Sequence, residues 1–201
     1  VSGGEKGALH GPSIMPSGEY RAYYEIADIF TAIAAKNEDG TACCTYIGKE
    51  GSGHFVKMVH NGIEYADMQL LAELYAILKR LYPKDRAAVQ KAFHQLNQHN
   101  LASYLLDITE DILQKKEQEE WLLDKVLDVA KQKGTGKWTA CVSLGYGVPV
   151  PSLIEAVEAR FLSSMKAQRL QAEQCYAGTQ DEETSNEQLA ADLYKAVLLA
   201  K

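Results

Sequence analysis

The sequence predicts a mainly α protein in which a short α/β unit, residues 1–48, precedes an all-helical region, residues 49–201. Two observations support this fold class. Turn-forming glycines and prolines and short β-prone runs gather in the first part, whereas in the second apolar residues recur three and four positions apart, the spacing of an α-helix. We therefore expect the end of a parallel-sheet domain followed by a helical domain.

The first part is predicted to run strand, helix, strand. Residues 1–18 are rich in glycine and proline and predict turns, with one short strand at residues 13–15. Residues 19–36 predict an amphipathic helix. Residues 42–47 are a second β-prone run that follows a polar turn. The apolar face of the predicted helix carries Ile26, Ile29, Phe30 and Ile33.

The second part is predicted to be a succession of helices. The first begins at Gly53 and continues to about Leu81, because no proline interrupts it before Pro83. The charged run at residues 115–120 predicts a surface loop, and residues 133–136 predict a glycine loop. Further helices are predicted over residues 85–99, 101–115, 121–129 and 152–175, and from 189 to the end. Polar connections are predicted at residues 97–100 and 178–186.

Composition and charge exclude several function classes. The chain has 46% hydrophobic and 24% charged residues and a net charge of −6, which argues against a nucleic-acid or anionic-membrane surface. No apolar run approaches the roughly 20 residues that span a bilayer. The cysteines form no CxxC pair, so we expect reduced thiols, no metal site and a cytoplasmic protein. They are Cys43, Cys44, Cys141 and Cys175.

A polar stripe runs along the first long helix of the second part. Positions i, i+3, i+4, i+7 and i+8 lie on one face of a helix with 3.6 residues per turn. In this helix those positions are Lys57, His60, Asn61, Glu64 and Tyr65. A solvated face is the alternative interpretation, although such faces are usually built from paired Glu, Lys and Gln. Five different polar side chains on one face indicate a binding site instead.

The spacing within the stripe also suggests its chemistry. Lys57 and Glu64 lie roughly 10 Å apart along the helix axis at 1.5 Å per residue, which is too far for a helical ion pair. The separation suits a small molecule held between a base and an acid. The flank with Val56, Val59 and Ile63 is predicted to pack inward.

A second informative stretch is the glycine loop at residues 132–138. It is not a P-loop, because that motif needs a Gly where Lys131 stands and a Ser or Thr where Trp138 stands. Two lysines, a threonine and backbone N–H groups can still hold an anion. A helix cap followed by a plain loop remains the alternative.

The residues Gly51, Gly53, Lys57 and Asn61 match GxGxxxKxxxN, the helix motif of the β-hydroxyacid dehydrogenases. The longer string from His54 to Gln69 closely resembles the 6-phosphogluconate dehydrogenase (decarboxylating) family. The stretch from the glycine loop to Val150 is similar to the same family. The resemblance implies that residues 1–48 are the residual end of an NADP-binding Rossmann-type domain. Residues 49–201 would be the first half of an all-α substrate-binding and dimerisation domain.

The resemblance further implies a reaction of the pentose phosphate pathway, in which 6-phosphogluconate is oxidised by NADP and decarboxylated to ribulose 5-phosphate. Lys57 would act as general base toward the carbon-3 hydroxyl of the substrate, and Glu64 as general acid that protonates carbon 1 of the enol left after CO₂ is lost. The phosphate would be held by Tyr65, Lys133, Thr135 and Arg160. The other substrate-binding residues implied are Ser2, Gly3, Gly4, His60 and Asn61.

No GxGxxG fingerprint is present in the sequence, so the resemblance implies that a preceding domain binds most of the NADP. It also implies a homodimer, a phosphosugar acid as substrate and no metal. Because both ends look cut, we expect a fragment that is inactive alone. Two alternatives remain open: another β-hydroxyacid dehydrogenase acting on a small hydroxy acid, or a non-catalytic helical assembly module.

Overall fold

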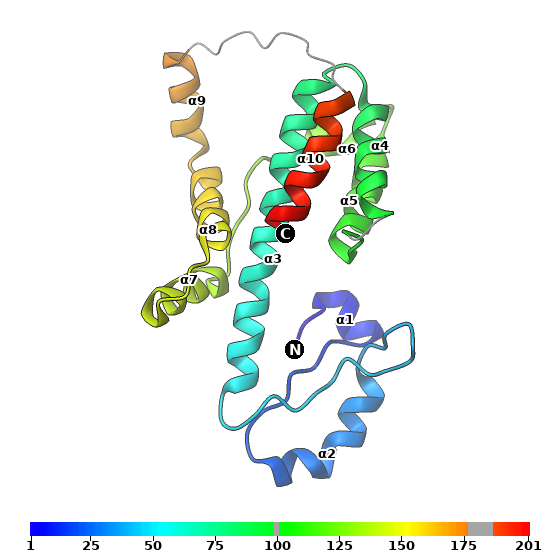
Figure 1. Ribbon diagram of the computed structural model, residues 1–201, viewed down its shortest axis with the longest axis vertical. Helices are drawn as coiled ribbons and strands as arrows, with labels where there is room; N and C mark the ends of the chain where they lie inside the picture. Colours follow the sequence, from blue (N-terminus) through cyan, green and yellow to red (C-terminus); the bar gives the residue numbers. More distant parts are fainter. Residues whose placement is uncertain (99–100, 177–186) are drawn as a thin grey trace. The chain divides into compact units, whose positions relative to one another are not determined.

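The computed structural model of the protein describes residues 1–98, 101–176 and 187–201 (Figure 1). The chain forms two compact units. The first contains residues 1–63 and 134–147, and the second contains residues 64–133 and 148–201. Helix α3 (Ser52–Leu81) is the longest helix described, and it passes from the first unit into the second after Ile63.

The first unit combines three helices and the start of α3 with short parallel pairing. Ile14 pairs with Cys44, and Ser17 pairs with Gly48, both in parallel. The parallel arrangement is as predicted, but these are isolated bridges and not the predicted strands. Pro16 has no N–H to continue a ladder, although its carbonyl accepts a hydrogen bond from Ile47 N at 2.8 Å. The helices are α1 (Gly4–His10), α2 (Tyr20–Ile33) and α7 (Thr135–Tyr146).

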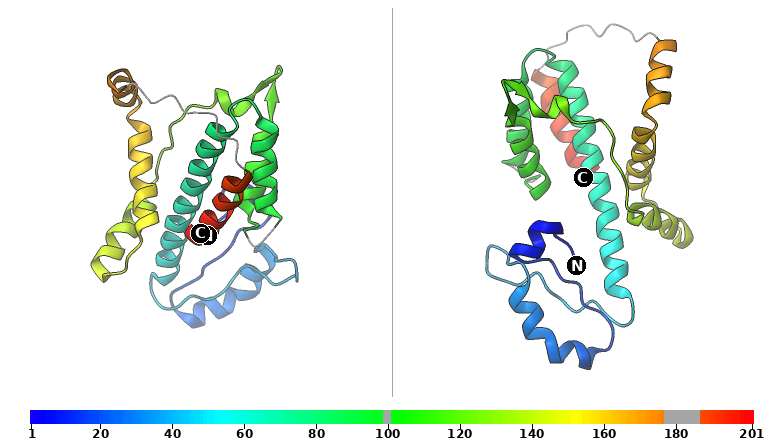
Figure 2. Two further views of the ribbon diagram at one scale, coloured as in Figure 1. Left: turned by 45° about the horizontal axis from the view of Figure 1, so that its top comes forward. Right: turned by 180° about the vertical axis from the view of Figure 1, so that it is seen from behind.

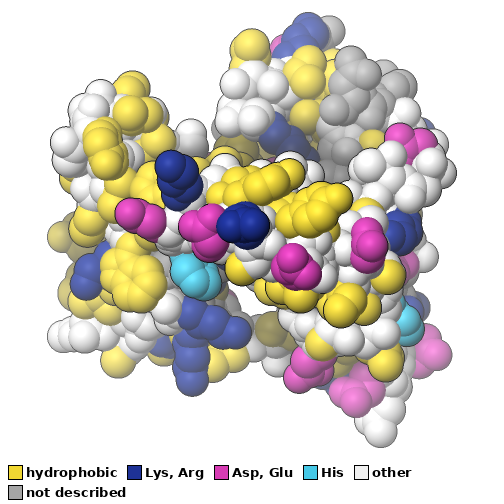
Figure 3. Space-filling view, turned by 90° about the horizontal axis from the view of Figure 1, so that it is seen from below, with side chains coloured by type: hydrophobic (Ala, Val, Ile, Leu, Met, Phe, Trp, Pro, Cys, Tyr) yellow, Lys and Arg dark blue, Asp and Glu magenta, His cyan; other side chains and the backbone are white. Residues whose placement is uncertain are grey.

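Two predicted apolar faces of the first unit are exposed. Helix α2 has no buried residue, and Ile29 on its predicted apolar face is 60% exposed. On α3 the prediction that Val56 and Ile63 pack inward is wrong, since Ile63 is 61% exposed. The residues described here do not cover that side of α3. Exposed hydrophobic side chains of this kind form the yellow areas of Figure 3.

The beginning of α3 packs through a glycine instead. Gly53 is buried, and a Cβ added to it would lie 2.1 Å from the carbonyl oxygen of Met15 and 2.9 Å from Ser17 Oγ. No side chain fits at that distance, so the backbone of α3 can approach residues 15–17 only because this residue is glycine. The close packing of α3 therefore requires glycine at the second position of the GxGxxxKxxxN motif.

The second unit is helical around one apolar core. Besides α3 from Glu64 on, the elements of this unit are α4 (Arg86–Asn97), α5 (Tyr104–Gln114), β1 (Lys116–Glu117), β2 (Glu120–Trp121), α6 (Leu122–Lys125), α8 (Pro151–Ser164), α9 (Lys166–Cys175) and α10 (Glu187–Ala200). Figures 1 and 2 show α10 alongside the second half of α3. The core contains Leu71, Leu74, Leu78, Val89, Phe93, Leu96, Leu101, Leu106, Leu113 and Val197.

The predicted boundaries of α3, α4 and α5 are confirmed to within a few residues. Asp85 caps α4 by accepting the Ala88 N–H at 3.0 Å, and Ser103 caps α5 by accepting from Leu106 N at 3.4 Å. The prediction of one helix over residues 152–175 is wrong, because the backbone leaves helical geometry at Met165 (φ −89°, ψ 46°) and divides it into α8 and α9.

Three other connections differ from the predictions. The helix predicted over residues 121–129 is only the four-residue α6. The charged loop at residues 115–120 contains the hairpin β1–β2. Helix α7 was not predicted, because its glycines and its β-branched threonines and valine are weak helix formers. The predicted loop at residues 178–186 and the end of the 97–100 corner lie outside the described residues. None of the described helices is both long enough and apolar enough to cross a membrane.

Candidate functional site

Three predicted site residues of the first unit form one hydrogen-bonded chain. Lys57 Nζ donates to Asn61 Oδ1, one turn further along α3. Asn61 Nδ2 donates to Thr135 Oγ1 at 3.1 Å, a contact between residues 74 positions apart. Thr135 begins α7 directly after Gly134, whose φ of 99° favours glycine. The chain orients the Asn61 amide, with its oxygen toward the lysine and its nitrogen toward the glycine loop.

Thr139 is a supporting residue that the sequence analysis missed. Its side chain is 4% exposed, and Oγ1 lies 3.0 Å from Met58 O and 2.9 Å from Thr135 O. A hydroxyl has one hydrogen, so Thr139 donates to one of these carbonyls at a time. Because Met58 lies on α3, this contact holds α7 against the helix that carries Lys57. A threonine one turn after Thr135 was the available signal.

The opening turn of the chain belongs to the same unit. Ser2 and Ser13 exchange two backbone hydrogen bonds of 2.8 and 2.9 Å. Gly3 has φ 135°, and an added Cβ would lie 2.8 Å from Gly7 Cα, so this position requires glycine. Gly4, with φ 56°, begins α1. The backbone hydrogen bonds of Ser2 and Gly3 are made within residues 2–13.

His60 is half-buried on the part of α3 that belongs to the first unit. The remaining predicted residues lie in the second unit. Glu64 is half-buried on α3. Its neighbour Tyr65 is only 7% exposed, and its hydroxyl accepts a hydrogen bond from Lys133 N at 3.3 Å. The Arg160 guanidinium lies over the Tyr65 ring, 3.7 Å from the ring centroid.

Arg160 is held in place by further contacts on both sides. Its Nη1 donates to Lys131 O at 2.7 Å, and Nη2 lies 3.7 Å from Met68 Sδ. A guanidinium has five N–H donors in a planar fork, and these contacts occupy only part of that fork. The side chain of Lys133 is exposed, and its backbone N–H is held by the Tyr65 hydroxyl. The planar guanidinium of Arg160 is suited to binding a phosphate.

The predicted site residues therefore form two groups, one in each unit. The first unit contains Ser2, Gly3, Gly4, Lys57, His60, Asn61 and Thr135. The second contains Glu64, Tyr65, Lys133 and Arg160. Among the described residues, no three His, Cys, Asp or Glu side chains are grouped so that they could hold a metal ion.

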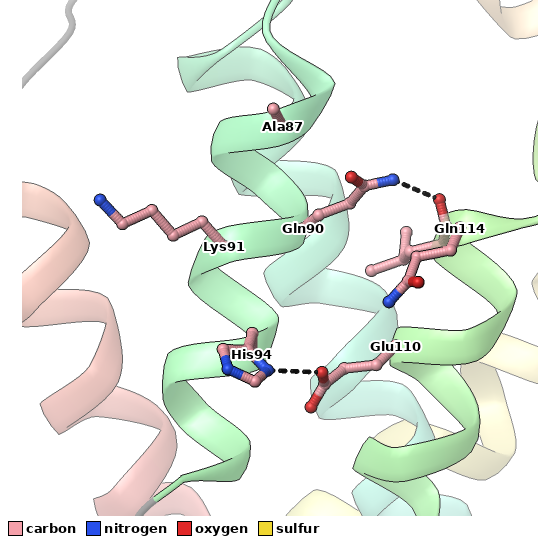
Figure 4. A pocket seen from close by; sticks show the side chains of 7 residues that line it. Ala87, Gln90, Lys91, His94, Glu110 and Gln114 are labelled. Carbon is pink, nitrogen blue, oxygen red and sulfur yellow. Dashed lines mark hydrogen bonds and ion pairs between the residues drawn. The ribbon is translucent and has the colours of Figure 1, made fainter.

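A separate pocket of about 320 Å³ opens between α4 and α5 (Figure 4). His94 Nδ1 lies 2.9 Å from Glu110 Oε2, and Gln90 Nε2 donates to Leu113 O at 2.7 Å. The remaining lining residues are Ala87, Lys91 and Gln114. None of the predicted site residues lines this pocket, so it is distinct from both groups.

An α/β segment followed by a helical domain, with Lys57 and Asn61 on its first long helix, is the organisation of the β-hydroxyacid dehydrogenase class. Residues 53–201 match the family "6-phosphogluconate dehydrogenase, C-terminal domain". Residues 1–48 match the family "NAD binding domain of 6-phosphogluconate dehydrogenase". The chain thus belongs to the 6-phosphogluconate dehydrogenase family.

Individual relatives agree with this family. The decarboxylating 6-phosphogluconate dehydrogenase of Staphylococcus aureus (strain N315) is 54% identical over 173 residues, which are 86% of this chain and 37% of the relative. That of Staphylococcus epidermidis is 50% identical over 200 residues, 96% of this chain and 43% of the relative. The solved Plasmodium falciparum 6-phosphogluconate dehydrogenase is 40% identical with a TM-score of 0.90, covering 98% of this chain and 43% of that one.

The chain therefore spans less than half the length of the relatives that it matches. The structural relative is described in its apo form, with its cofactor NADP⁺ and with its substrate 6-phosphogluconate.

Proposed function

We propose that the protein carrying these residues converts 6-phosphogluconate and NADP⁺ to ribulose 5-phosphate, CO₂ and NADPH. The observation that carries this proposal is the cluster of Tyr65, Lys133 and Arg160 in the second unit. These residues come from three separate stretches of sequence, and their donors suit a phosphate group. A dehydrogenase for a small hydroxy acid has no use for such a cluster. The names of the relatives support the same substrate.

Lys57 is proposed as the general base that removes the proton of the carbon-3 hydroxyl. Its contact with Asn61 supports this role, because the amide oxygen fixes the position of the amine. Once carbon 3 is a ketone, the neighbouring carboxylate leaves as CO₂ and its electron pair moves to the carbonyl oxygen. Protonated Lys57 then stabilises the enolate oxygen that develops there.

Glu64 is proposed as the general acid that protonates carbon 1 of the enol. It follows Lys57 by seven residues in the sequence of α3. His60 and Asn61 are proposed to bind the hydroxyl and carboxylate groups, with Ser2, Gly3 and Gly4. Thr135 is proposed to contact the phosphate. These steps need no metal, because the ketone oxygen accepts the electron pair released when CO₂ leaves.

NADP would supply the oxidation when bound, but the described residues do not make a dinucleotide site of their own. Gly51 precedes α3 and Gly53 lies in its first turn, where an added Cβ would be 2.1 Å from Met15 O, so the backbone of α3 is packed against protein at Gly53. We assign no residue of this chain to NADP and propose that it is bound mainly by a domain preceding residue 1.

We also propose a division of the chain at residues 48 and 49, into the end of the NADP-binding domain and the first half of the helical domain. The two family matches support this division. We propose a cytoplasmic homodimer in which the helical domain forms the interface. The exposed apolar side chains of the first unit are consistent with further protein covering this chain.

The proposed function is tested by turnover of three substrates. The protein carrying these residues is given NADP with 6-phosphogluconate, with gluconate or with a short 3-hydroxy acid, and NADPH and CO₂ are measured together. We expect equal amounts of both products from 6-phosphogluconate and much lower kcat/KM for the other two. Preference for the short acid would favour the small-acid alternative. Binding of partner proteins without any turnover would favour the assembly module.

A further inference from the structure

Residues 128–133 lie in the connection between α6 and α7 and have no regular secondary structure, and side-chain contacts hold Asp128, Ala130, Lys131 and Lys133. Backbone N–H and C=O groups outside helices and sheets need partners from elsewhere. In this connection, side chains of α8 and α9 serve as partners for several backbone groups, and all of these residues belong to the second unit. We call residues 128–133 the anchored segment. Its last residue is Lys133, of the proposed phosphate cluster.

Two side chains of α8, one turn apart, hold the middle of the anchored segment. Ser163 Oγ accepts a hydrogen bond from Ala130 N at 3.0 Å. The same hydroxyl has one hydrogen, which it donates either to Arg160 O at 2.8 Å or to Ala130 O at 3.4 Å. Arg160 itself donates to Lys131 O at 2.7 Å. The residue proposed to bind phosphate is therefore also a structural contact of the segment.

The start of the anchored segment is held by charge. The carboxylate of Asp128 pairs with Lys166 through Oδ1 and with Arg169 through Oδ2, the latter at 2.9 Å. Arg169 Nη2 also lies 3.2 Å from Asp128 O and 3.0 Å from Ser163 O. One guanidinium thus joins the segment to the C-terminal end of α8, where a cation is favourable. Because the helix breaks at Met165, Lys166 and Arg169 belong to α9 and not to α8.

We propose that Ser163 and Asp128 are positioning residues for the phosphate end of the substrate, acting through the anchored segment; this inference rests on the proposed function. If the segment loosens, Lys131 O no longer holds Arg160 over the Tyr65 ring, and Lys133 N leaves the Tyr65 hydroxyl. Because binding and catalysis depend on alignment to within about 1 Å, a small shift of these groups weakens phosphate binding.

The first test compares two neighbouring serines. Ser163→Ala removes the acceptor for Ala130 N, whereas Ser164→Ala removes a hydroxyl that donates to Phe161 O within its own helix at 2.7 Å. In the protein carrying these residues, we expect Ser163→Ala to raise the KM for 6-phosphogluconate about three- to tenfold, the value of one hydrogen bond. The kcat, and the kcat/KM for gluconate, stay within about twofold of the unsubstituted protein. Ser164→Ala changes none of these.

The second test compares two aspartates that each pair with two cations. Asp128→Asn weakens the anchored segment, whereas Asp124→Asn disrupts pairs with Lys79 and Arg86 elsewhere in the unit. We expect only Asp128→Asn to raise the KM for 6-phosphogluconate and to speed amide exchange at Ala130. Asp128→Glu, which keeps the charge, is expected to reverse part of the rise in KM and part of the faster amide exchange. A rise in KM for both aspartate variants would indicate general destabilisation and overturn the inference.

The same experiments distinguish failure of the proposed function from failure of the positioning inference. Lack of turnover of 6-phosphogluconate by the unsubstituted protein would overturn the proposed function and the phosphate role with it. Normal turnover together with an unchanged KM in Ser163→Ala would overturn the positioning inference alone. Thermal unfolding of each variant shows whether it is folded. If Ser163→Ala fails to fold, the Asp128 pair decides the question.

Discussion

The guanidinium of Arg160 lies 3.7 Å from the centroid of the Tyr65 ring, and the Tyr65 hydroxyl accepts the backbone N–H of Lys133. Tyr65 therefore contacts two of the residues proposed to bind phosphate, with its face toward one and its hydroxyl toward the other. A cation over an aromatic face is stabilised by the ring quadrupole. Since Tyr65 is buried, it fixes both partners before any ligand binds.

We predict that Tyr65→Phe removes the contact with Lys133 and keeps the contact with Arg160. The ring under Arg160 remains, but Lys133 N loses its acceptor, so the KM for 6-phosphogluconate is expected to rise about three- to tenfold. Tyr75→Phe on the same helix is the matched control, because Tyr75 packs against the core and belongs to neither group. Steady-state kinetics of both variants check this. Equal KM values for the two variants would contradict it.

We predict that Arg160→Lys severely weakens binding of the phosphorylated substrate. Lysine keeps the charge but has no planar fork, so it loses both the stacking on Tyr65 and paired donation to a phosphate. Hydrogen bonds to charged groups suggest a loss of about 10- to 100-fold in affinity for 6-phosphogluconate. Calorimetric titration measures it, and gluconate is the control ligand. A loss of equal size for gluconate would show that Arg160 does not recognise the phosphate.

We predict that Thr135→Val lowers turnover by releasing Asn61. Valine has nearly the shape of threonine but no oxygen to accept the Asn61 amide, whose other end contacts Lys57. We expect a loss of about three- to tenfold in kcat/KM, largely restored in Thr135→Ser. Thr109→Val is the control, because its hydroxyl donates to Leu105 O within its own helix. If Thr135→Ser is as poor as Thr135→Val, the hydroxyl is not the cause.

We predict that the contribution of Asp128 to stability is lost in acid. Hydrogen bonds from Lys166 and then Arg169 lower the pKa of Asp128 from 3.8 to about 2. A pKa lowered by folding stabilises the folded state above the unfolded pKa, and this gain declines as the pH falls from about 4 to about 2. Unfolding of the protein and of Asp128→Asn should therefore differ near neutral pH and converge at the acid end. A difference in unfolding free energy that is as large at about pH 2 as near neutral pH would contradict this assignment.

We predict opposite outcomes for two glycines. Gly53→Ala places a Cβ 2.1 Å from Met15 O, so the start of α3 must move, and we expect a destabilisation of about 1–3 kcal/mol. Gly145→Ala, within α7, meets nothing within 4 Å and should be neutral or stabilising by up to about 1 kcal/mol. Chemical denaturation measures both. Similar stabilities would mean that α3 can shift away from residue 15 at little cost.

The sequence predicted well wherever the information is local. The period of apolar residues and the position of Pro83 predicted α3, and that one helix determines which face carries Lys57, Asn61 and Glu64. Strong helical periodicity likewise predicted α4 and α5. The same reasoning failed for α7, whose residues have weak helix propensity. It predicted helix α2 correctly, although the described residues leave the apolar face of that helix exposed.

What the sequence alone determined about this protein is its helical second part and its family motif, because both depend on spacings of a few residues along one chain segment. Only the tertiary structure decided that Asn61 meets Thr135, that Tyr65 lies under Arg160 and that Ser163 holds Ala130. These partners are separated by dozens of residues. Their meeting depends on how separate helices pack together, and local periodicity carries no record of that packing.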